Sequence, residues 1–403
     1  MARHAKKLSQ GNDATQHLSL GALALCFPLA KIQDIIDRCD KGSRRVRDLP
    51  AAVVAVYVIA LNLFPGVAYK SVLRWMLAGL QWLRQKDFRV STKGALSQAR
   101  QALGALPMRC IHEEMALPLA DPKLPGSFWK GFHLVAFDGS TLALQDTKSN
   151  SETFGRSSNQ NGEGAWPMAR FVALVEVGTH LIFAAALGGY RDSEITLAKK
   201  ILPRLSAGML CLADRLFPGY GLWKEASATG AQLLWRAKIG MKLKLIKRLS
   251  DGSYLANWKP SGGPACTKKE ITVRVIEYKL REPGQTASEA IYRLITTILD
   301  PTVATAEELV AIYPQRWEIE ITIKESKTIY RKGQVTLRSK VAELVHQEFW
   351  GLLLAHYLVR KMMAQAAQSQ EIDPDKLSYQ GSIEIIKAML AGPVLHFPPP
   401  HQK

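Results

Sequence analysis

The chain has 403 residues, 47% of them hydrophobic and 22% charged, which is an ordinary composition for a globular protein of two or three domains. Its formal net charge of +18 at pH 7 is unusual and favours a polyanionic partner, either nucleic acid or an anionic membrane surface. The five cysteines are scattered and show no CxxC or Cys/His spacing. This pattern argues against a zinc module and a disulfide framework, and it favours a reducing cytosol.

Residues 1–125 are predicted to be helical. Apolar residues recur at helical spacing over 31–41 and again over 69–85. The apolar run between them, 51–64, is shorter than the ~20 residues that cross a bilayer, so we expect a buried core helix. An earlier apolar stretch, 18–30, follows a long polar region, and we interpret it as an amphipathic segment and not as a signal peptide.

Four basic residues lie close together between these helices: Lys41, Arg44, Arg45 and Arg47. Such a cluster is either a solvated charged face or a set of contacts to nucleic-acid phosphates. Both interpretations stay open at this point. The second makes the cluster a candidate DNA-binding site, although no helix-turn-helix motif identifies a recognition helix.

Strand-like and helix-like segments alternate after residue 125. A short apolar run ends at Asp138 and Gly139, and a polar, glycine-rich loop follows over 156–166. Next come two strands with a hairpin spacing, a helix, a strand ending at Asp214, a helix and a strand (169–178, 180–189, 193–208, 209–214, 219–230 and 231–238). This order predicts an α/β fold with helices packed on a mixed sheet.

Residues 236–300 interrupt this alternation. They are rich in Lys, Thr, Val, Ile and Tyr and contain several turn motifs, so we predict a β-rich insertion. We predict that a helix starts after this region, because Thr305 and Glu308 have the spacing of a capping box. The last residues, "HFPPPHQK", are expected to be irregular.

The segment 313–327, "YPQRWEIEITIKESK", favours two different structures. The alternation in "EIEITI" is typical of a half-buried strand. Four polar residues at helical spacing instead share one stripe of a helix: Tyr313, Arg316, Glu320 and Lys327. A charged helix face with i, i+4 pairs would explain such a stripe without any function.

Three carboxylates are candidate metal ligands: Asp138, Asp214 and Glu320. Each aspartate directly follows an apolar strand, and strand ends border the ligand crevice of open α/β sheets. Taken singly, the aspartates are explained by turns or helix caps, and Glu320 by a charged helix face. Together they suit a two-metal phosphoryl-transfer site, because Mg²⁺ takes oxygen ligands and two ions activate the attacking oxygen and stabilise the leaving one.

These motifs resemble those of bacterial DDE transposases of the insertion element 4 family. Segment 313–327 has the spacing of the family's YREK motif: Tyr, two residues, Arg, three residues, Glu, six residues, Lys. "FDGSTL" and "LADRLFPGY" look like the family's first and second aspartate regions, and "RRVRDLPAAVVAVYVIALNLFPGVAYKSV" looks like its N-terminal domain. The resemblance extends over residues 20–365 approximately.

The resemblance implies a ribonuclease-H-like core and cut-and-paste transposition of DNA. Asp138, Asp214 and Glu320 would bind two divalent ions, Mg²⁺ or Mn²⁺. Segment 313–327 would be helical, with a start or kink at Pro314. Three residues of the motif would contact phosphates near the cleaved DNA end: Tyr313, Arg316 and Lys327. The implied partners are double-stranded DNA, as element ends and target, and a second copy of the chain, in a cytoplasmic, nucleoid-associated setting without a membrane.

We expect five domains or parts. They are a helical N-terminal DNA-binding domain, the first part of the catalytic core, an inserted β-rich subdomain, the second part of the core with Glu320, and a C-terminal helix with an irregular tail (1–125, 126–235, 236–300, 301–365 and 366–403). Basic and aromatic residues of the insertion would lie near the DNA end: Lys242, Lys244, Lys247, Arg248 and Trp258. Trp258 would either hold an unpaired base, since stacking is worth ~1–3 kcal/mol per base, or belong to the core.

Three other functions remain open from the sequence. A non-catalytic DNA-binding protein, such as a decayed transposase acting as a repressor, would keep the basic residues but needs no acidic triad. A structure-specific nuclease of the same fold would cut DNA without joining strands. A tyrosine recombinase would form a phosphotyrosine bond, but Tyr313 is not expected to act as a nucleophile.

Overall fold

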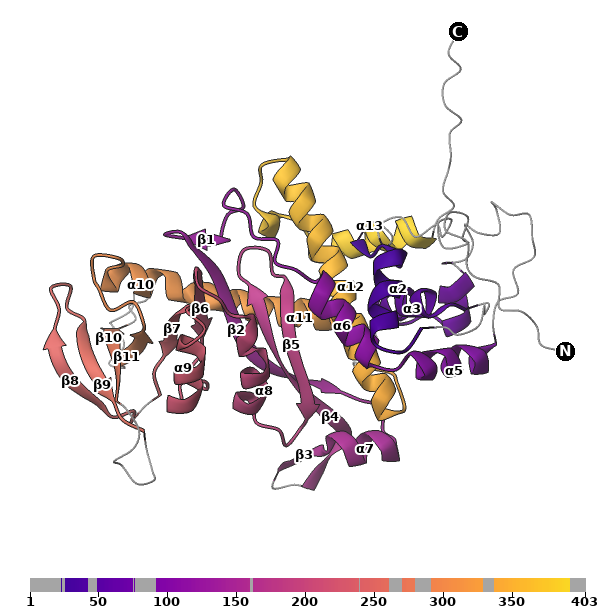
Figure 1. The fold of residues 1–403 in the computed structure, drawn as a ribbon, viewed down its shortest axis with the longest axis horizontal. Helices are drawn as coiled ribbons and strands as arrows, with labels where there is room; N and C mark the ends of the chain where they lie inside the picture. The colour runs from indigo at the N-terminus through magenta and orange to yellow at the C-terminus, as the bar shows by residue number, and fades with distance from the viewer. Residues whose placement is uncertain are drawn as a thin grey trace, which may run out of the picture.

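The N-terminal part of the protein is helical. The structure, a computed structural model, describes residues 23, 26–42, 49–74, 76, 92–159, 162–238, 240–260, 270–279, 291–328 and 337–391. Four helices lie together at the right of Figure 1: α2 (Leu29–Arg38), α3 (Ala51–Leu63), α5 (Lys93–Leu103) and α6 (Leu106–Met115). The helices predicted over 31–41 and 51–64 are confirmed, and residues 69–74 are helical as well.

Helix α3 is the predicted core helix, because every one of its residues is buried. It packs against α12 (Ala342–Ser369), and Gly351 of α12 allows the close approach. A Cβ on Gly351 would lie only 2.8 Å from Val58 Cγ1 and 2.7 Å from Asn62 Nδ2. Among the residues that the structure describes, no helix combines the length and apolarity that crossing a membrane requires.

A mixed sheet of eleven strands forms the centre of the molecule. β4 pairs antiparallel with both β5 and β2, whereas β2, β6 and β7 run parallel to one another. The bounds of these strands are β2 (Phe132–Ala143), β4 (Gly162–Glu176), β5 (Ile182–Gly189), β6 (Met209–Ala213) and β7 (Gln232–Arg236). The antiparallel hairpin of β4 and β5 lies beside three parallel strands, in the order β5-β4-β2-β6-β7, which agrees with the predicted ribonuclease-H-like fold.

Two expectations about strand limits are wrong. β2 does not end at Asp138 but continues to Ala143, because its antiparallel pairing with β4 starts at Val135 and reaches Ala143. The predicted glycine-rich loop contains β3 (Arg156–Asn159) and the start of β4 at Gly162, which pair with each other. The polar side chains of this segment that the structure describes are exposed or half-buried on these strands, so their polarity indicates exposure and not a loop.

Helices cover both faces of the central strands. In Figure 1, α8 (Glu194–Ile201) and α9 (Tyr220–Ser227) lie in front of the sheet, and the segment that carries the YREK motif runs behind it. That segment consists of α10 (Ala306–Ile312), a 3-10 turn η3 (Tyr313–Arg316) and α11 (Trp317–Thr328). The predicted capping box of Thr305 and Glu308 forms at the start of α10. Shorter elements complete the core: β1 (Phe128–Trp129), α7 (Lys148–Phe154) and η2 (Leu202–Arg204).

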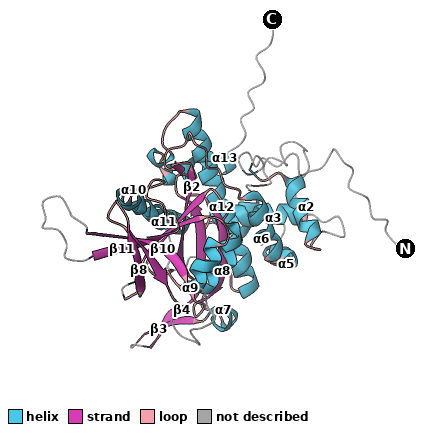
Figure 2. Ribbon diagram, turned by 60° about the vertical axis from the view of Figure 1, so that its left-hand side comes forward, coloured by secondary structure: helices cyan, strands magenta, loops and turns pink. Residues whose placement is uncertain are grey.

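The long helix α12 lies between the N-terminal helices and the sheet (Figure 2). It contacts α3 and α6 as well as α7 and β5. After α12 the chain forms η4 (Pro374–Lys376) and α13 (Tyr379–Ala391), and both pack on α12. The predicted irregular tail after residue 391 lies outside the described residues.

The predicted β-rich region extends the same sheet. β11 (Ile291–Thr296) pairs antiparallel with β7, so the hydrogen-bonded ladder runs on without a break. The strands beyond it, in spatial order, are β10 (Ile271–Lys279), β9 (Tyr254–Trp258) and β8 (Leu243–Arg248). The strand content matches the sequence pattern, whereas the division of the chain into five domains remains a prediction.

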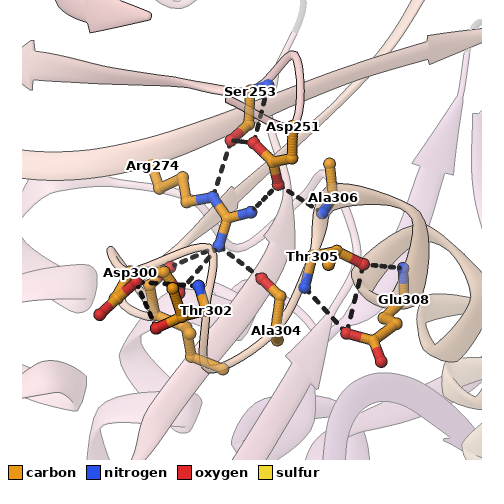
Figure 3. Close-up of polar contacts among 10 residues, drawn as sticks. Asp251, Ser253, Arg274, Asp300, Thr302, Ala304, Thr305, Ala306 and Glu308 are labelled. Carbon is orange, nitrogen blue, oxygen red and sulfur yellow. Dashed lines mark hydrogen bonds and ion pairs between the residues drawn. The ribbon is translucent and has the colours of Figure 1, made fainter. Parts of the chain in front are cut away.

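A buried arginine ties these added strands to helix α10 (Figure 3). Arg274 of β10 is fully buried, pairs with Asp251 in the turn between β8 and β9, and donates to Ser253 Oγ at 2.8 Å. Its Nη1 donates to the Ala304 carbonyl oxygen at 2.7 Å, and Asp251 accepts from the Ala306 amide at 2.7 Å. These contacts fix the start of α10, and they therefore also help to position η3 and α11, which follow α10 directly in the chain.

Candidate active site

Asp138 and Asp214 come from neighbouring parallel strands. β2 and β6 pair in register as far as Ala136 and Leu212, so Asp138 lies beside the end of β6, and Asp214 is the first residue after that strand. The Gly139 amide donates to Asp138 Oδ1 at 2.7 Å. The two carboxylates lie close enough for the charge of Asp214 to raise the pKa of Asp138.

Glu320 is carried by α11, so "EIEITI" is helical despite its alternating pattern. Pro314 lies in the first turn of η3, where its missing amide leaves no hydrogen bond broken. Ile319 and Ile323, one helical turn apart, are buried, and α11 contacts β2. The isoleucines therefore anchor the helix, while Glu320 remains 41% exposed beside the strand of Asp138.

Arg316 links two of the three acids. Its Nη2 donates to Glu320 Oε1 at 3.0 Å, and its Nη1 lies 3.7 Å from Asp138 Oδ2. Burial acts to lower the pKa of Arg316, but Tyr313 and the pairing with Glu320 and Asp138 raise it. The guanidinium is thus a cation placed between two carboxylates, and it keeps their repulsion small.

A cavity of about 500 Å³ opens between β2 and α11. Its walls are formed by Asp138, Gly139, Ser140, Glu320, Ile323, Lys324 and Lys327. Lys327 Nζ donates to Ser140 Oγ at 2.5 Å, and burial lowers the pKa of Lys327. The cavity therefore brings the last acid and the lysine of the YREK motif together with the first aspartate, while Asp214 is not part of this lining.

The carboxyl group of Asp138 is costly to ionise. Its pKa is raised to about 6, mainly by burial and further by Asp214 and Glu194, whereas the Gly139 amide and Arg316 act in the opposite direction. A divalent cation would relieve both the burial of charge and the repulsion between carboxylates. Carboxylate oxygens are also the ligands that Mg²⁺ and Mn²⁺ prefer, so these residues fit the ions that the motif implies.

Asp138→Asn is expected to stabilise the protein in the absence of metal. The unfolded chain ionises Asp138 near its ordinary pKa of 3.8, while the folded state does so only near 6. The free energy of unfolding is therefore unaffected by Asp138 below about pH 3.8, and ionisation of Asp138 lowers it as the pH rises through about 6. Removing the charge should raise the free energy of unfolding at neutral pH by about 3 kcal/mol, because each of the roughly two pKa units between these values corresponds to about 1.36 kcal/mol. Thermal unfolding with a chelator measures this; the gain should vanish at about pH 4, and a lower neutral-pH stability would contradict it.

The sequence did not predict one acid beside the site. Glu194 begins α8, which Ser193 caps, and its side chain lies over Gly139: a Cβ there would be 2.3 Å from Glu194 Cδ. The glycine that follows Asp138 thus leaves room for a fourth carboxylate, whose charge also raises the pKa of Asp138. In the sequence, only the glycine after Asp138 could have indicated that another side chain lies close to the site. Asp-Gly pairs are also common in ordinary turns, so this signal did not identify Glu194.

Three residues predicted to contact DNA are buried: Tyr313, Trp258 and Arg316, whose guanidinium is already paired with Glu320 and Asp138. Tyr313 is 8% exposed, and its hydroxyl donates to the Ala213 carbonyl oxygen at 3.2 Å, so a phosphate contact would have to replace this bond. Trp258 is 5% exposed and packs edge-on against Tyr220 and Trp223. This packing contradicts a stacking role for Trp258, because an enclosed ring offers no face to a base, and we do not propose one.

The predicted basic contacts divide into two groups. Arg44, Arg45 and Arg47 lie outside the described residues. The basic side chains on and next to β8 are exposed at one edge of the sheet: Lys242, Lys244, Lys247 and Arg248. This edge remains available for contact with a polyanion.

Comparison with known proteins places these features in a family. Residues 17–113 match the family model described as insertion element 4 transposase N-terminal, and residues 129–358 match the transposase DDE domain. The chain is 31% identical over 305 residues to the transposase InsG for insertion sequence element IS4 of Escherichia coli K12, which covers 73% of this chain and 67% of that protein. Among solved structures, a cryo-EM structure of a piggyBac transposase synaptic complex with hairpin DNA covers 93% of this chain and 80% of that one, at 11% identity and a TM-score of 0.44.

Proposed function

Because the chain belongs to the insertion element 4 family of DDE transposases, enzymes that cleave DNA and transfer its strands, we propose that Asp138, Asp214 and Glu320 are its catalytic, metal-binding triad. The observation that carries this proposal is the cavity between β2 and α11, where Asp138 and Glu320 meet although they are far apart in sequence. Asp214 joins them through the register of β2 and β6. Few arrangements other than a cation site explain why three half-buried carboxylates would be brought together in this way.

The ions that we propose are Mg²⁺ or Mn²⁺. When bound, they supply activation of the attacking oxygen and stabilisation of the leaving oxygen in phosphoryl transfer. We assign Arg316 and Lys327 to the phosphates of the DNA strand, because their cationic groups border the same acids and would hold a negatively charged backbone against the cavity. The carboxylate of Asp138 must be ionised to bind a cation, so the affinity of the metal-free protein for Mg²⁺ or Mn²⁺ is expected to fall as the pH drops below about 6.

No side chain of the protein needs to attack DNA in this proposal. Tyr313 would be the nucleophile of a tyrosine recombinase, but its hydroxyl donates to Ala213, and burial raises its pKa. A phenol that is bonded to the backbone and resists ionisation is poorly suited to form a phosphotyrosine. The geometry therefore favours direct attack on the phosphodiester by water or a DNA hydroxyl.

A strand-transfer assay tests the proposed function. The substrate is linear DNA that ends in the inverted repeats flanking the gene, incubated with Mg²⁺ or Mn²⁺ and a target plasmid. We expect cleavage at the repeats and joining of their ends to the plasmid. Cleavage without joining would indicate a structure-specific nuclease, and binding without either reaction would indicate a non-catalytic DNA-binding protein.

We propose that the N-terminal basic cluster contacts DNA phosphates. Replacing Lys41, Arg44, Arg45 and Arg47 by alanine should lower the slope of log affinity against log salt by about 0.9 for each lost contact. Filter binding to element ends over a range of salt concentrations measures the slope. Lys200→Ala/Lys224→Ala, which removes two exposed charges on α8 and α9, serves as the control. An unchanged slope in the fourfold variant would mean that the cluster is only a solvated face.

We also propose that two copies of the chain hold the two element ends together. Light scattering of the protein with short end fragments should then give a mass of two chains and two DNA fragments. One chain per fragment at all concentrations would contradict the proposal.

A further inference from the structure

Helix α11 carries a second set of acids on the face opposite Glu320. Glu318 and Glu325 are seven residues apart and share one stripe, and Glu320 lies about half a turn away from both. Their side chains are 23% and 16% exposed. They are therefore too enclosed for an ordinary solvated helix face, and both are held by partners from other elements.

Arg360 of α12 holds Glu325. Arg360 is 2% exposed, and it donates from Nε to Glu325 Oε2 at 3.0 Å and from Nη2 to the same carboxylate. The ring of Tyr379 in α13 lies next to the guanidinium, with 5.3 Å between Cζ and the ring centroid. A fork of two hydrogen bonds fixes orientation as well as distance, so this pair restricts the rotation of α11 about its own axis.

His180, in the turn between β4 and β5, holds Glu318. Its Nε2 lies 3.0 Å from Glu318 Oε2 and 3.3 Å from Oδ1 of Asp375 in η4. On the other side of the ring, Nδ1 is in hydrogen-bonding contact with Nη2 of Arg360. A guanidinium can only donate, so Nδ1 accepts, and Nε2 carries the proton that bridges the two carboxylates.

This arrangement suits hydrogen bonding better than a metal ion. Ligand atoms of His180, Glu318 and Asp375 lie within 4.8 Å of one another, which is close enough for a cation. A metal would need the lone pair of Nε2, but the contact with Arg360 leaves the proton on that nitrogen. We call the hydrogen-bonded group the α11 clamp; its members are His180, Glu318, Glu325, Arg360 and Asp375.

The α11 clamp joins three parts of the chain. His180 has a φ of +57°, a left-handed conformation that a residue other than glycine keeps only where its surroundings hold it. The strand before this turn, β4, pairs directly with β2 at Asp138. Arg360 and Asp375 lie beyond residue 358, where the matched DDE domain ends. The clamp thus connects the strand beside Asp138 and the C-terminal helices to the helix that carries Glu320.

We infer that the α11 clamp positions Glu320 against Asp138, so that residues after the DDE domain set how tightly the site binds its metal. The inference rests on the proposed role of Glu320 as a metal ligand. Contacts that orient metal ligands typically change metal affinity by 10–100-fold when they are lost. Asp375 is the most informative member, because its side chain is 46% exposed and its removal leaves the buried pair of Arg360 and Glu325 intact.

Asp375→Ala tests the inference, with Asp375→Glu as the conservative variant. Asp375 acts through His180 and Glu318, so we expect the affinity for Mn²⁺, measured by titration calorimetry without DNA, to fall by about tenfold, the lower end of the range. Asp375→Glu should restore most of it. The unfolding temperature and the affinity for element ends should stay near those of the wild type. Glu384→Ala, which removes an acid of α13 paired with Lys387, should leave Mn²⁺ binding unchanged.

Several results would overturn the inference. Unchanged Mn²⁺ affinity in Asp375→Ala would do so, and so would a loss that Asp375→Glu does not restore. A fall in unfolding temperature without weaker Mn²⁺ binding would assign Asp375 a purely structural role. Glu320→Gln separates this inference from the proposed function. If that variant still binds Mn²⁺ like the wild type, the triad itself is wrong; if it loses Mn²⁺ while Asp375→Ala keeps it, only the clamp is wrong.

Discussion

Glu320→Gln is expected to bind element ends normally and to cut them at least about 1,000-fold more slowly than the wild type. Glutamine keeps the size of the side chain and can still accept the hydrogen bond that Arg316 donates at 3.0 Å, so the local structure should survive. It removes the negative charge that a hard cation requires. A lost metal ion removes several kcal/mol of transition-state stabilisation, and each 1.36 kcal/mol is a factor of ten in rate.

A gel-shift assay and a metal-dependent cleavage assay on the same preparation measure the two properties separately. Glu307→Gln is the matched control, because it makes the same change at an exposed position of α10. Near-normal cleavage by Glu320→Gln would refute the assignment of the triad. A folded variant that no longer binds ends would show instead that Glu320 has a structural role.

Arg274→Ala is expected to lower the free energy of unfolding by about 3–5 kcal/mol. The substitution leaves Asp251, which is 14% exposed, without its buried partner, and it removes the donor to the Ala304 carbonyl oxygen. Because these contacts fix the start of α10, the variant should also lose activity at temperatures where it remains folded. Urea denaturation followed by fluorescence measures the stability change.

Arg293→Ala is the control for Arg274. Arg293 lies on the neighbouring strand β11 and pairs with Glu277, but both side chains are about one-third exposed (33% and 37%). Surface pairs of this kind contribute about 1 kcal/mol or less. Equal effects of the two substitutions would contradict the view that the burial of Arg274 gives it a structural role.

Local elements were predictable because their signals are local. The core helix α3 follows from an apolar run between Pro50 and Pro65, and α10 follows from the capping box of Thr305 and Glu308. The order of strands and helices after residue 125 was also visible, since each strand is a short apolar run between turn residues. The spacing of the YREK motif then placed Glu320 on a helix against the alternation of its neighbours.

Features that depend on distant pairing were not predictable. The pattern of β2 gives no sign that the strand continues past Asp138, because its extension depends on β4, more than twenty residues later. The sequence left open whether Trp258 stacks on a base or belongs to the core, and its packing against Trp223 favours the core. Burial is a property of the assembled sheet, and one sequence does not encode it residue by residue.

The interactions among the charged residues of the α11 clamp could not be predicted from the sequence either. Glu318 and Glu325 have the spacing and type of an ordinary solvated helix face. Their partners Arg360 and Asp375 lie in segments that no sequence signal connects to the acids. Long-range ion pairs of this kind become apparent only when the helices are placed in space.

The position of Mn²⁺ in crystals of the protein, found from its anomalous scattering, tests the central claim most directly. We predict Mn²⁺ bound by the carboxylates of Asp138, Asp214 and Glu320, and its loss from crystals of Glu320→Gln. Mn²⁺ bound between His180, Glu318 and Asp375, with none at the triad, would contradict both the proposed active site and the hydrogen-bonding role of the α11 clamp.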